Sequence, residues 1–184
     1  MYQEMFGRLI SEGHVSRLVS AYHFEKDGTL QSLIHYLKYG GITALGVELG
    51  RRLGDCVQAT LGGLLISGIL PVPLHPTKRR ERGYNQSEYI CKGVQERTGL
   101  PVVEPLLMRR KYTKSQTELD IEQRKENVRD AFSVHKSFHR VIPDQTFLIV
   151  DDIITTGSTV NACAKVLIEH SAKQVFAASV ALAN

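Results

Sequence analysis

One segment near the C-terminus constrains the fold more than any other part of the sequence. Residues 147–150 form an apolar run typical of a buried strand, and two acids, Asp151 and Asp152, follow directly. A turn of Thr, Gly and Ser residues comes next. Behind it, apolar residues recur at helical spacing at Val160, Cys163, Ala164, Leu167 and Ile168. A strand that passes through a tight polar turn into an amphipathic helix is typical of an α/β fold with a mainly parallel sheet.

The remaining elements fit the same fold. Helical spacing predicts helices at about 30–40, at 43–60 and from residue 85 onward, and apolar runs predict strands at 66–74, 101–103 and 175–182. The inward positions of the second helix are expected to be Leu45, Leu49, Leu53, Cys56 and Val57. Asn85 and Glu88 resemble a capping box at the start of the third helix. Pro71 and Pro73 imply that the first strand ends in a loop.

Composition indicates an ordinary globular protein. Of the 184 residues, 42% are hydrophobic and 23% are charged, and this length fits a single domain over 1–184. We expect Cys56, Cys91 and Cys163 to be reduced and buried, with neither a disulfide nor a zinc site. No signal peptide is recognisable, and the longest uncharged run, 61–74, is shorter than the ~20 residues of a membrane helix. A cytoplasmic protein without membrane insertion is therefore expected.

The polar turn has the features of an anion site. Backbone N–H groups at a helix start point outward together, and Gly157 permits close approach or a positive φ. Thr155, Thr156, Ser158 and Thr159 add hydroxyl donors for phosphate oxygens. The two acids before the turn would repel a phosphate but accept hydrogen bonds from vicinal sugar hydroxyls. The turn lacks the Lys of a Walker loop and the spacing of a dinucleotide loop, so a sugar phosphate fits it better.

A simpler interpretation of this turn needs no ligand. An ordinary strand-to-helix connection would use one hydroxyl as an N-cap and place an acid near the helix dipole. It accounts for one acid and one hydroxyl, but not for two adjacent acids and four hydroxyls around a single glycine.

Two basic segments accompany the turn. The segment 71–86 follows a predicted strand, and its cationic side chains could hold a magnesium diphosphate, although a solvated basic loop is the alternative. These side chains are Lys78, Arg79, Arg80 and Arg82. The segment 109–130, which includes Lys111, is rich in charge and poor in apolar residues. It is predicted to be an extended flexible loop with a helical turn near its end.

The segment 150–159 resembles the signature by which type I phosphoribosyltransferases bind 5-phosphoribosyl 1-diphosphate (PRPP). Other matching positions make the chain similar to one subfamily, the ComF (GntX-like) family, from about Leu30 to the C-terminus. These positions are 33–39, 71–73, 82–86, Gln116, Arg124, Asn127 and Phe132.

The resemblance implies a type I phosphoribosyltransferase fold in which 109–130 is a hood loop that closes over PRPP. It implies that Asp151 and Asp152 bind the ribose, that residues 155–159 bind its 5-phosphate, and that Mg²⁺ arrives with the diphosphate. The expected reaction transfers the phosphoribosyl group to an unknown nitrogenous acceptor, and no catalytic residue is assigned. Lys38 either reaches the diphosphate or lies on a helix surface. Many family members carry an N-terminal four-cysteine zinc module, but no CxxC pair occurs here, so no zinc is expected.

Two other functions stay open on the same fold. One is a non-catalytic module that handles single-stranded DNA during uptake, with 78–82 and 109–114 as a basic groove and Tyr84 and Tyr112 as stacking surfaces. The other is a PRPP-sensing regulator. A homodimer is also left open.

Overall fold

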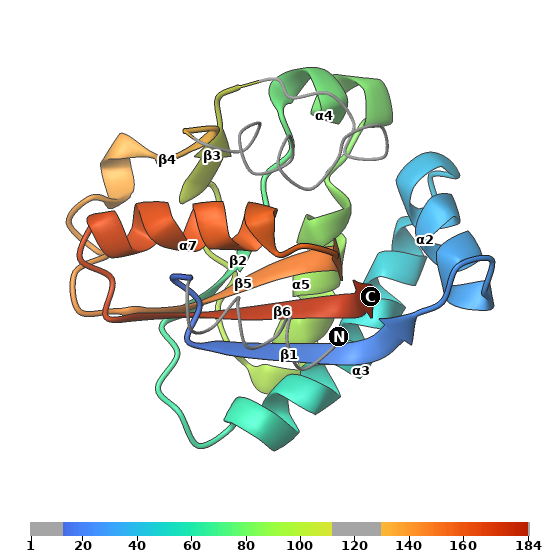
Figure 1. Ribbon diagram of the computed structural model, residues 1–184, viewed down its shortest axis with the longest axis horizontal. Helices are drawn as coiled ribbons and strands as arrows, with labels where there is room; N and C mark the ends of the chain where they lie inside the picture. The colour runs from blue at the N-terminus through green and yellow to red at the C-terminus, as the bar shows by residue number, and fades with distance from the viewer. Residues whose placement is uncertain (1–12, 112–129, 184) are drawn as a thin grey trace.

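The computed structural model describes residues 13–111 and 130–183, which fold around a four-stranded parallel sheet. The strand order is β1-β6-β5-β2, and every neighbouring pair is parallel (Figure 1). The strands are β1 (Arg17–Phe24), β6 (Gln174–Ala183), β5 (Thr146–Ile154) and β2 (Gly68–Pro71). The α/β class and the mainly parallel sheet are therefore confirmed.

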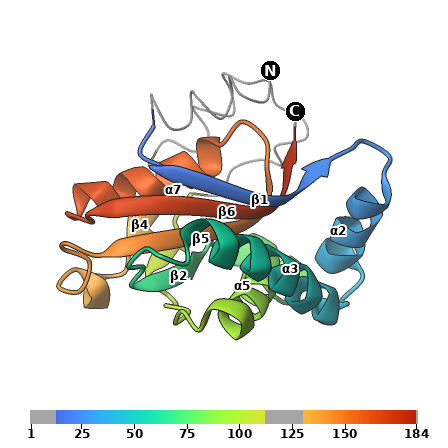
Figure 2. The same ribbon diagram turned by 90° about the horizontal axis from the view of Figure 1, so that it is seen from below.

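Helices cover both faces of this sheet. Figure 2 shows α7 on one face and α3 with α5 on the other. The helices are α2 (Thr29–Tyr39), α3 (Thr43–Leu61), α4 (Pro76–Arg82), α5 (Gln86–Thr98) and α7 (Ser158–Glu169). Because side chains alternate along a strand, Phe147 and Ile149 of β5 join the core under α7, whereas Leu148 and Val150 join the core under α3 and α5. β5 thus contributes to both hydrophobic cores.

Helices α3 and α5 meet almost backbone to backbone. A Cβ atom built on Gly50 would lie 2.1 Å from the carbonyl oxygen of Ile90, and one on Gly93 would lie 2.1 Å from that of Val47. No side chain fits at either position. This close contact fixes the position of α5, whose first turn reaches the sheet edge where β5 ends.

The predicted loop after β2 is wrong in part, because residues 76–82 form the helix α4. His75 is its N-cap, with Nδ1 accepting a hydrogen bond from the Thr77 N–H at 3.2 Å, and Pro76 stands in the first turn. Gly83 ends the helix in the left-handed conformation, with φ 85°. Pro at a helix start and Gly at its end are favourable termini, and the Arg, Lys and Glu residues between them are good helix formers.

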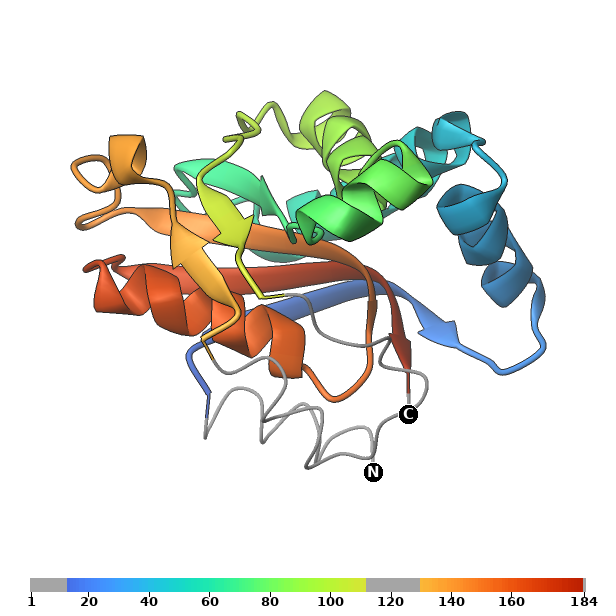
Figure 3. The ribbon, with the colours of Figure 1, turned by 90° about the horizontal axis from the view of Figure 1, so that it is seen from above.

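The structure also contains strands that the sequence did not reveal. These are β1 and the antiparallel pair β3 (Leu107–Arg109) and β4 (Phe132–Val134), followed by a short 3-10 helix at Lys136–Phe138. Figures 1 and 3 place β3 and β4 on the same side of the molecule as α4. The predicted strand 101–103 is reduced to one parallel bridge between Val102 and Ile69. The hood-loop prediction falls mostly on 112–129, outside the described residues.

The predicted helix start at Asn85 and the inward face of α3 are confirmed in part. Asn85 caps α5 by accepting a hydrogen bond from the Ser87 N–H at 3.2 Å, but the Glu88 carboxylate pairs with Arg79 and does not complete a capping box. Leu49, Leu53 and Val57 of α3 are buried, whereas Leu45 and Cys56 are only half-buried. All three cysteines are free thiols, and Cys91 and Cys163 are buried. No helix among the described residues combines the length and apolar character needed to cross a membrane.

Candidate functional site

The candidate site lies where β5 passes into α7. β5 continues beyond the predicted run and includes both acids, ending at Ile154. Gly157 follows in the left-handed conformation, with φ 72°, and is the N-cap of α7. Glycine adopts this conformation at no steric cost, and it offers no side chain to cap the first turn. The helix therefore begins with a glycine at the position where a polar side chain would otherwise close its end.

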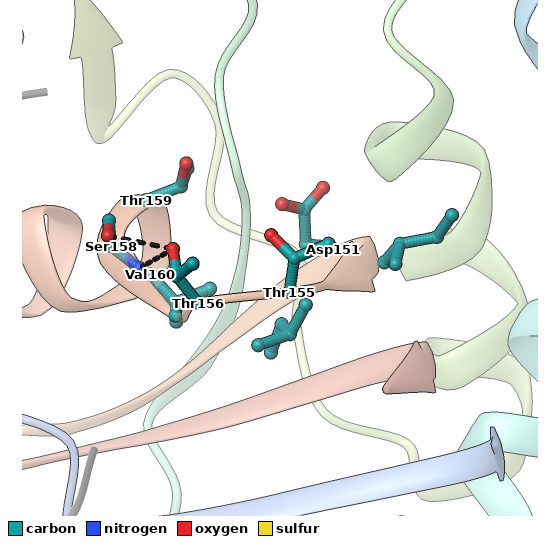
Figure 4. A pocket seen from close by; sticks show the side chains of 9 residues that line it. Asp151, Thr155, Thr156, Ser158, Thr159 and Val160 are labelled. Atoms are coloured by element: carbon teal, nitrogen blue, oxygen red, sulfur yellow. Dashed lines mark hydrogen bonds between the residues drawn. The ribbon is translucent and has the colours of Figure 1, made fainter. Parts of the chain in front are cut away.

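A pocket at this turn is lined by Asp151 and by residues 153–160. Figure 4 shows Asp151 and Thr155 on one side and Thr156, Ser158 and Thr159 around the helix start. The Thr156 and Ser158 hydroxyl oxygens lie 2.8 Å apart, and the Ser158 N–H reaches the Thr156 hydroxyl at 3.4 Å. All five residues predicted to bind phosphate, 155–159, therefore line one pocket together with one of the two predicted ribose residues.

The two acids lie on opposite faces of β5. Asp151 faces the pocket, where its Oδ1 accepts hydrogen bonds from the Ser87 hydroxyl at 3.2 Å and from the Asp152 N–H at 2.9 Å. Asp152 does not line the pocket. Its Oδ1 accepts a weak hydrogen bond from the Gln86 amide at 3.5 Å, and its Oδ2 forms an ion pair with Lys38. The acids therefore have different surroundings despite being neighbours in sequence.

These surroundings move the pKa values of the two acids in opposite directions. Burial raises the pKa of Asp151 well above its ordinary value of 3.8, and the nearby charge of Asp152 raises it further. Burial also disfavours the charged form of Asp152. The charge of Lys38 and the hydrogen bonds that the Asp152 carboxylate accepts outweigh that effect and lower the Asp152 pKa. A proton bound to the pair therefore resides on Asp151, while Asp152 keeps its charge.

Lys38 is neither a surface lysine nor a group pointing into the pocket. Its side chain is 25% exposed and pairs with Asp152, whose side chain is 6% exposed. Burial works against the charge of Lys38, but the attraction of Asp152 and Asp151 more than compensates and raises the Lys38 pKa. This contact joins residues that are far apart in the sequence, so spacing within either segment gave no signal for it.

The basic residues of α4 do not converge on the pocket as a group. Lys78 pairs with Glu81 at 2.8 Å, and Arg79 forms a two-pronged contact with Glu88. Arg82 comes nearest to the acids, because its guanidinium donates to the Gln86 side-chain oxygen and Gln86 in turn contacts Asp152. Arg80 is exposed on α4 and Lys111 is exposed just after β3. The structure therefore connects one of the five predicted diphosphate residues to the acids.

Arg109 is a further cationic group near the acids. It ends β3, and its guanidinium lies 5.4 Å from the centre of the Phe132 ring. Burial lowers the Arg109 pKa, while the nearby Cys163 thiol and Asp151 carboxyl act in the opposite direction. The sequence had placed Arg109 at the start of the hood loop, so its position beside the core was not anticipated.

A separate cavity of about 310 Å³ lies next to the segment that follows β2. It is lined by prolines and leucines together with the Arg79–Glu88 ion pair and Glu104. Burial and the charge of Glu88 raise the Glu104 pKa. Within residues 13–111 and 130–183, no cluster of three or more His, Cys, Asp or Glu side chains is arranged to hold a metal ion.

Comparisons with known proteins agree with this geometry. The phosphoribosyl transferase domain family matches residues 98–184, which include β5, the polar turn and α7. Competence protein F of Haemophilus influenzae is 35% identical over 103 residues, covering 56% of this chain and 44% of that protein. DNA utilization protein YhgH of Salmonella typhimurium is 31% identical over 152 residues, covering 79% of this chain and 64% of that protein. The chain thus spans only part of the length of these relatives.

Two solved structures are similar to part of the chain at low sequence identity. The allosteric regulatory enzyme of purine biosynthesis is 22% identical with a TM-score of 0.46, and the match covers 73% of this chain and 25% of that one. Glutamine PRPP amidotransferase from B. subtilis is 19% identical with a TM-score of 0.49, covering 79% and 30%. Both likenesses are weak, so the fold assignment rests on the parallel sheet, the polar turn and the domain match. Taken with the relatives, these features show a type I phosphoribosyltransferase fold in a chain that is similar to the ComF-type proteins.

Proposed function

We propose that the chain binds PRPP, or the ribose 5-phosphate group of a related compound, in the pocket between β5 and α7. The observation that carries the proposal is the division of this pocket, with a carboxyl on one side and a ring of hydroxyls at a helix start on the other. A phosphate is favoured at the helix start because N–H groups and the helix dipole point toward it. Asp151 would then accept hydrogen bonds from ribose hydroxyls.

The diphosphate of PRPP would extend away from the turn toward cationic side chains. Arg82 and Arg109 support this direction, because Arg82 is linked to the acids through Gln86 and Arg109 interacts electrostatically with Asp151. Mg²⁺ bound to the diphosphate oxygens would neutralise part of the leaving-group charge. Lys78, Arg79, Arg80 and Lys111 remain proposed diphosphate contacts that would have to leave their present positions on the surface.

The proposed reaction is transfer of the phosphoribosyl group to a nitrogenous acceptor. The bond from C1 to the diphosphate breaks and its electron pair leaves with the diphosphate, while the acceptor nitrogen forms the new bond to C1 and gives up a proton to solvent. Positioning and charge stabilisation would provide most of the catalysis. The names of the relatives, competence protein F and DNA utilization protein, support a role linked to DNA uptake. Free cysteines are typical of reducing compartments and support the cytoplasm as its location.

Binding can be tested by calorimetric titration of PRPP in the presence of Mg²⁺. We expect Asp151→Asn and Thr156→Val each to weaken binding roughly 10-fold to 100-fold, because each removes a hydrogen bond to a charged or strongly polar ligand group. Thr60→Val, on the exposed side of α3, is the matched control and should bind like the wild type. A wild-type protein that does not bind PRPP would refute the proposal.

Transfer needs a separate assay. Release of diphosphate from PRPP should be measured across purine and pyrimidine bases and simple amines, with Asp151→Asn as the inactive reference. If the protein binds PRPP but none of the tested acceptors leads to release of diphosphate, this result would favour the PRPP-sensing function.

One observation favours the single-stranded DNA alternative. Tyr36 and Tyr39 on α2 are 54% and 70% exposed, and Arg82 lies 5.4 Å from the centre of the Tyr39 ring. Exposed aromatic rings beside basic groups are typical stacking surfaces for unpaired bases. Tyr84, which was predicted for this role, is half-buried with its hydroxyl bound to the Leu37 carbonyl, and Tyr112 lies outside the described residues. Salt-sensitive binding of DNA that survives Asp151→Asn but not Tyr39→Ala would support this alternative.

A further inference from the structure

The starting observation is that protein groups already occupy both carboxylate oxygens of Asp152. Gln86 donates to Oδ1 and Lys38 pairs with Oδ2. Asp152 is 4% exposed and does not line the pocket, whereas its neighbour Asp151 does. A carboxylate that is buried and paired on both oxygens is poorly placed to accept hydrogen bonds from a ligand.

Two side-chain contacts hold the end of α2 that carries Lys38 beside the acids. The Tyr84 hydroxyl donates to the carbonyl oxygen of Leu37, the residue before Lys38. On the other side, the Arg82 guanidinium lies over the Tyr39 ring, 5.4 Å from its centre. Lys38 is therefore flanked by two contacts that connect α2 to the segment 82–84. These contacts orient its side chain toward Asp152.

We propose that Lys38 is a positioning residue of the ligand site, which holds Asp152 as a charged anchor on one face of β5 and leaves Asp151 as the carboxyl that meets the ligand. This inference rests on the proposed function of the pocket. Lys38 would not touch the ligand. It would act through Asp152, by deciding which of two adjacent carboxyls carries the proton of the pair.

Charged and titratable groups approach the pair from five different elements. They are Lys38 of α2, Arg82 of α4, Cys91 of α5, Arg109 of β3 and Cys163 of α7. Both cysteines are buried, and burial raises their pKa values, so they stay neutral thiols. Lys38 is the cation paired directly with Asp152. Its removal should therefore raise the Asp152 pKa and spread the proton over both acids.

A consequence for binding follows from this assignment. Asp151 must release its proton to accept hydrogen bonds from two hydroxyls, so affinity should rise with pH and binding should release a proton to the buffer. Without the Lys38 cation, Asp152 takes up the proton more readily and its charge no longer raises the Asp151 pKa, so the pH midpoint of binding should move downward by about one unit. At a pH below the wild-type midpoint, affinity should then rise about tenfold.

The test compares PRPP binding with Mg²⁺ over a pH series for the wild type, Lys38→Met and Lys38→Arg, using buffers of different ionisation enthalpy to count released protons. Lys38→Met should show the lower midpoint and, below the wild-type midpoint, the tenfold gain in affinity, and Lys38→Arg should restore the wild-type values. Lys165→Met removes a lysine from the exposed ion pair with Glu169 and is the matched control. Binding by Lys38→Met with the wild-type affinity and midpoint would overturn the inference while leaving the proposed function intact.

A double-mutant cycle tests whether Lys38 acts through Asp152. In an Asp152→Asn background, adding Lys38→Met should change affinity no further, even if Lys38→Met alone is too unstable to assay. A loss of affinity on adding Lys38→Met in that background would instead mean direct contact with the ligand and would refute the positioning role.

Carboxyl NMR titration of the ligand-free protein gives a readout that does not depend on PRPP. The wild type should hold the proton on Asp151 and Lys38→Met should raise the midpoint of Asp152. An unchanged Asp152 midpoint would contradict the inference, whereas failure of PRPP to bind would contradict only the proposed function.

Discussion

Replacing Asp151 by Asn should make the protein more stable than the wild type as the pH rises. Burial and the charge of Asp152 raise the Asp151 pKa in the folded protein above its ordinary value of 3.8. Between these two pKa values the folded protein keeps a proton that the unfolded chain has released. The wild type therefore loses stability with rising pH in this window, by about 1.4 kcal/mol per pH unit for one proton. Asn carries no titrating proton, so the variant lacks this slope.

The variant should also fold normally. An Asn side-chain oxygen can accept the same hydrogen bonds from the Ser87 hydroxyl and the Asp152 N–H that Oδ1 of Asp151 accepts. The isosteric amide avoids a cavity and resembles the protonated acid in having no charge. At a pH near 4, where the wild-type acid is also protonated in the folded state, the two proteins should have similar free energies of unfolding.

Urea unfolding at several pH values from about 4 to about 8 measures this difference. The free energy of the variant minus that of the wild type should grow with pH and level off above the folded-state pKa of Asp151. Ser87→Ala is the control, because it removes a hydrogen bond to Asp151 but leaves the titrating group, so the wild-type slope should persist. A difference that is independent of pH, or that favours the wild type as the pH rises, would refute the assignment of the proton to Asp151.

Three further predictions concern packing and thiol chemistry. Gly93→Ala should lower the free energy of unfolding by about 1–3 kcal/mol in urea, because its Cβ would lie 2.1 Å from the Val47 carbonyl oxygen, whereas Gly63→Ala meets no atom within 4 Å and should be nearly neutral. Tyr84→Phe should cost about 1 kcal/mol through loss of the hydroxyl bond to Leu37, and an unchanged urea midpoint would contradict this. A thiol reagent at mildly alkaline pH should modify the half-buried Cys56 quickly in the native protein, while the two buried thiols, whose pKa values burial raises, should react only on unfolding.

The polar turn could be predicted from the sequence because its signals are local. The strand, the acids, the glycine and the amphipathic helix follow one another within residues 147–168, so their order along the chain is also their order in space. The same holds for α3, whose long helical period left little ambiguity.

Other elements were missed for identifiable physical reasons. β1 is an edge strand with a mixed pattern of exposed and buried residues, so it shows no clean alternation. β3 and β4 have three residues each, too few for any period to be visible. The helix α4 was taken for a loop because its charge dominated the interpretation, although Pro76 and Gly83 gave usable start and stop signals.

Within the site, the sequence indicated which residues line the pocket but not how the acids differ. Asp151 and Asp152 are chemically identical neighbours, and only the partners that the fold brings to them from α2 and α5 separate their roles. Such partners are set by long-range packing. Lys38 and Ser87 could be connected to the acids only once the positions of both helices were known.

The near contact of the α3 and α5 backbones predicts where this protein can tolerate sequence change. The orientation of the first turn of α5 depends on the close approach of main-chain atoms at Gly50 and Gly93, in addition to the buried side chains that the two helices share. A saturation mutagenesis library should therefore find the outward faces of both helices highly permissive, with almost every replacement at the two glycines eliminated. The outward faces of both helices could therefore be substituted extensively without changing the position of the α5 residues that contact the strand ends.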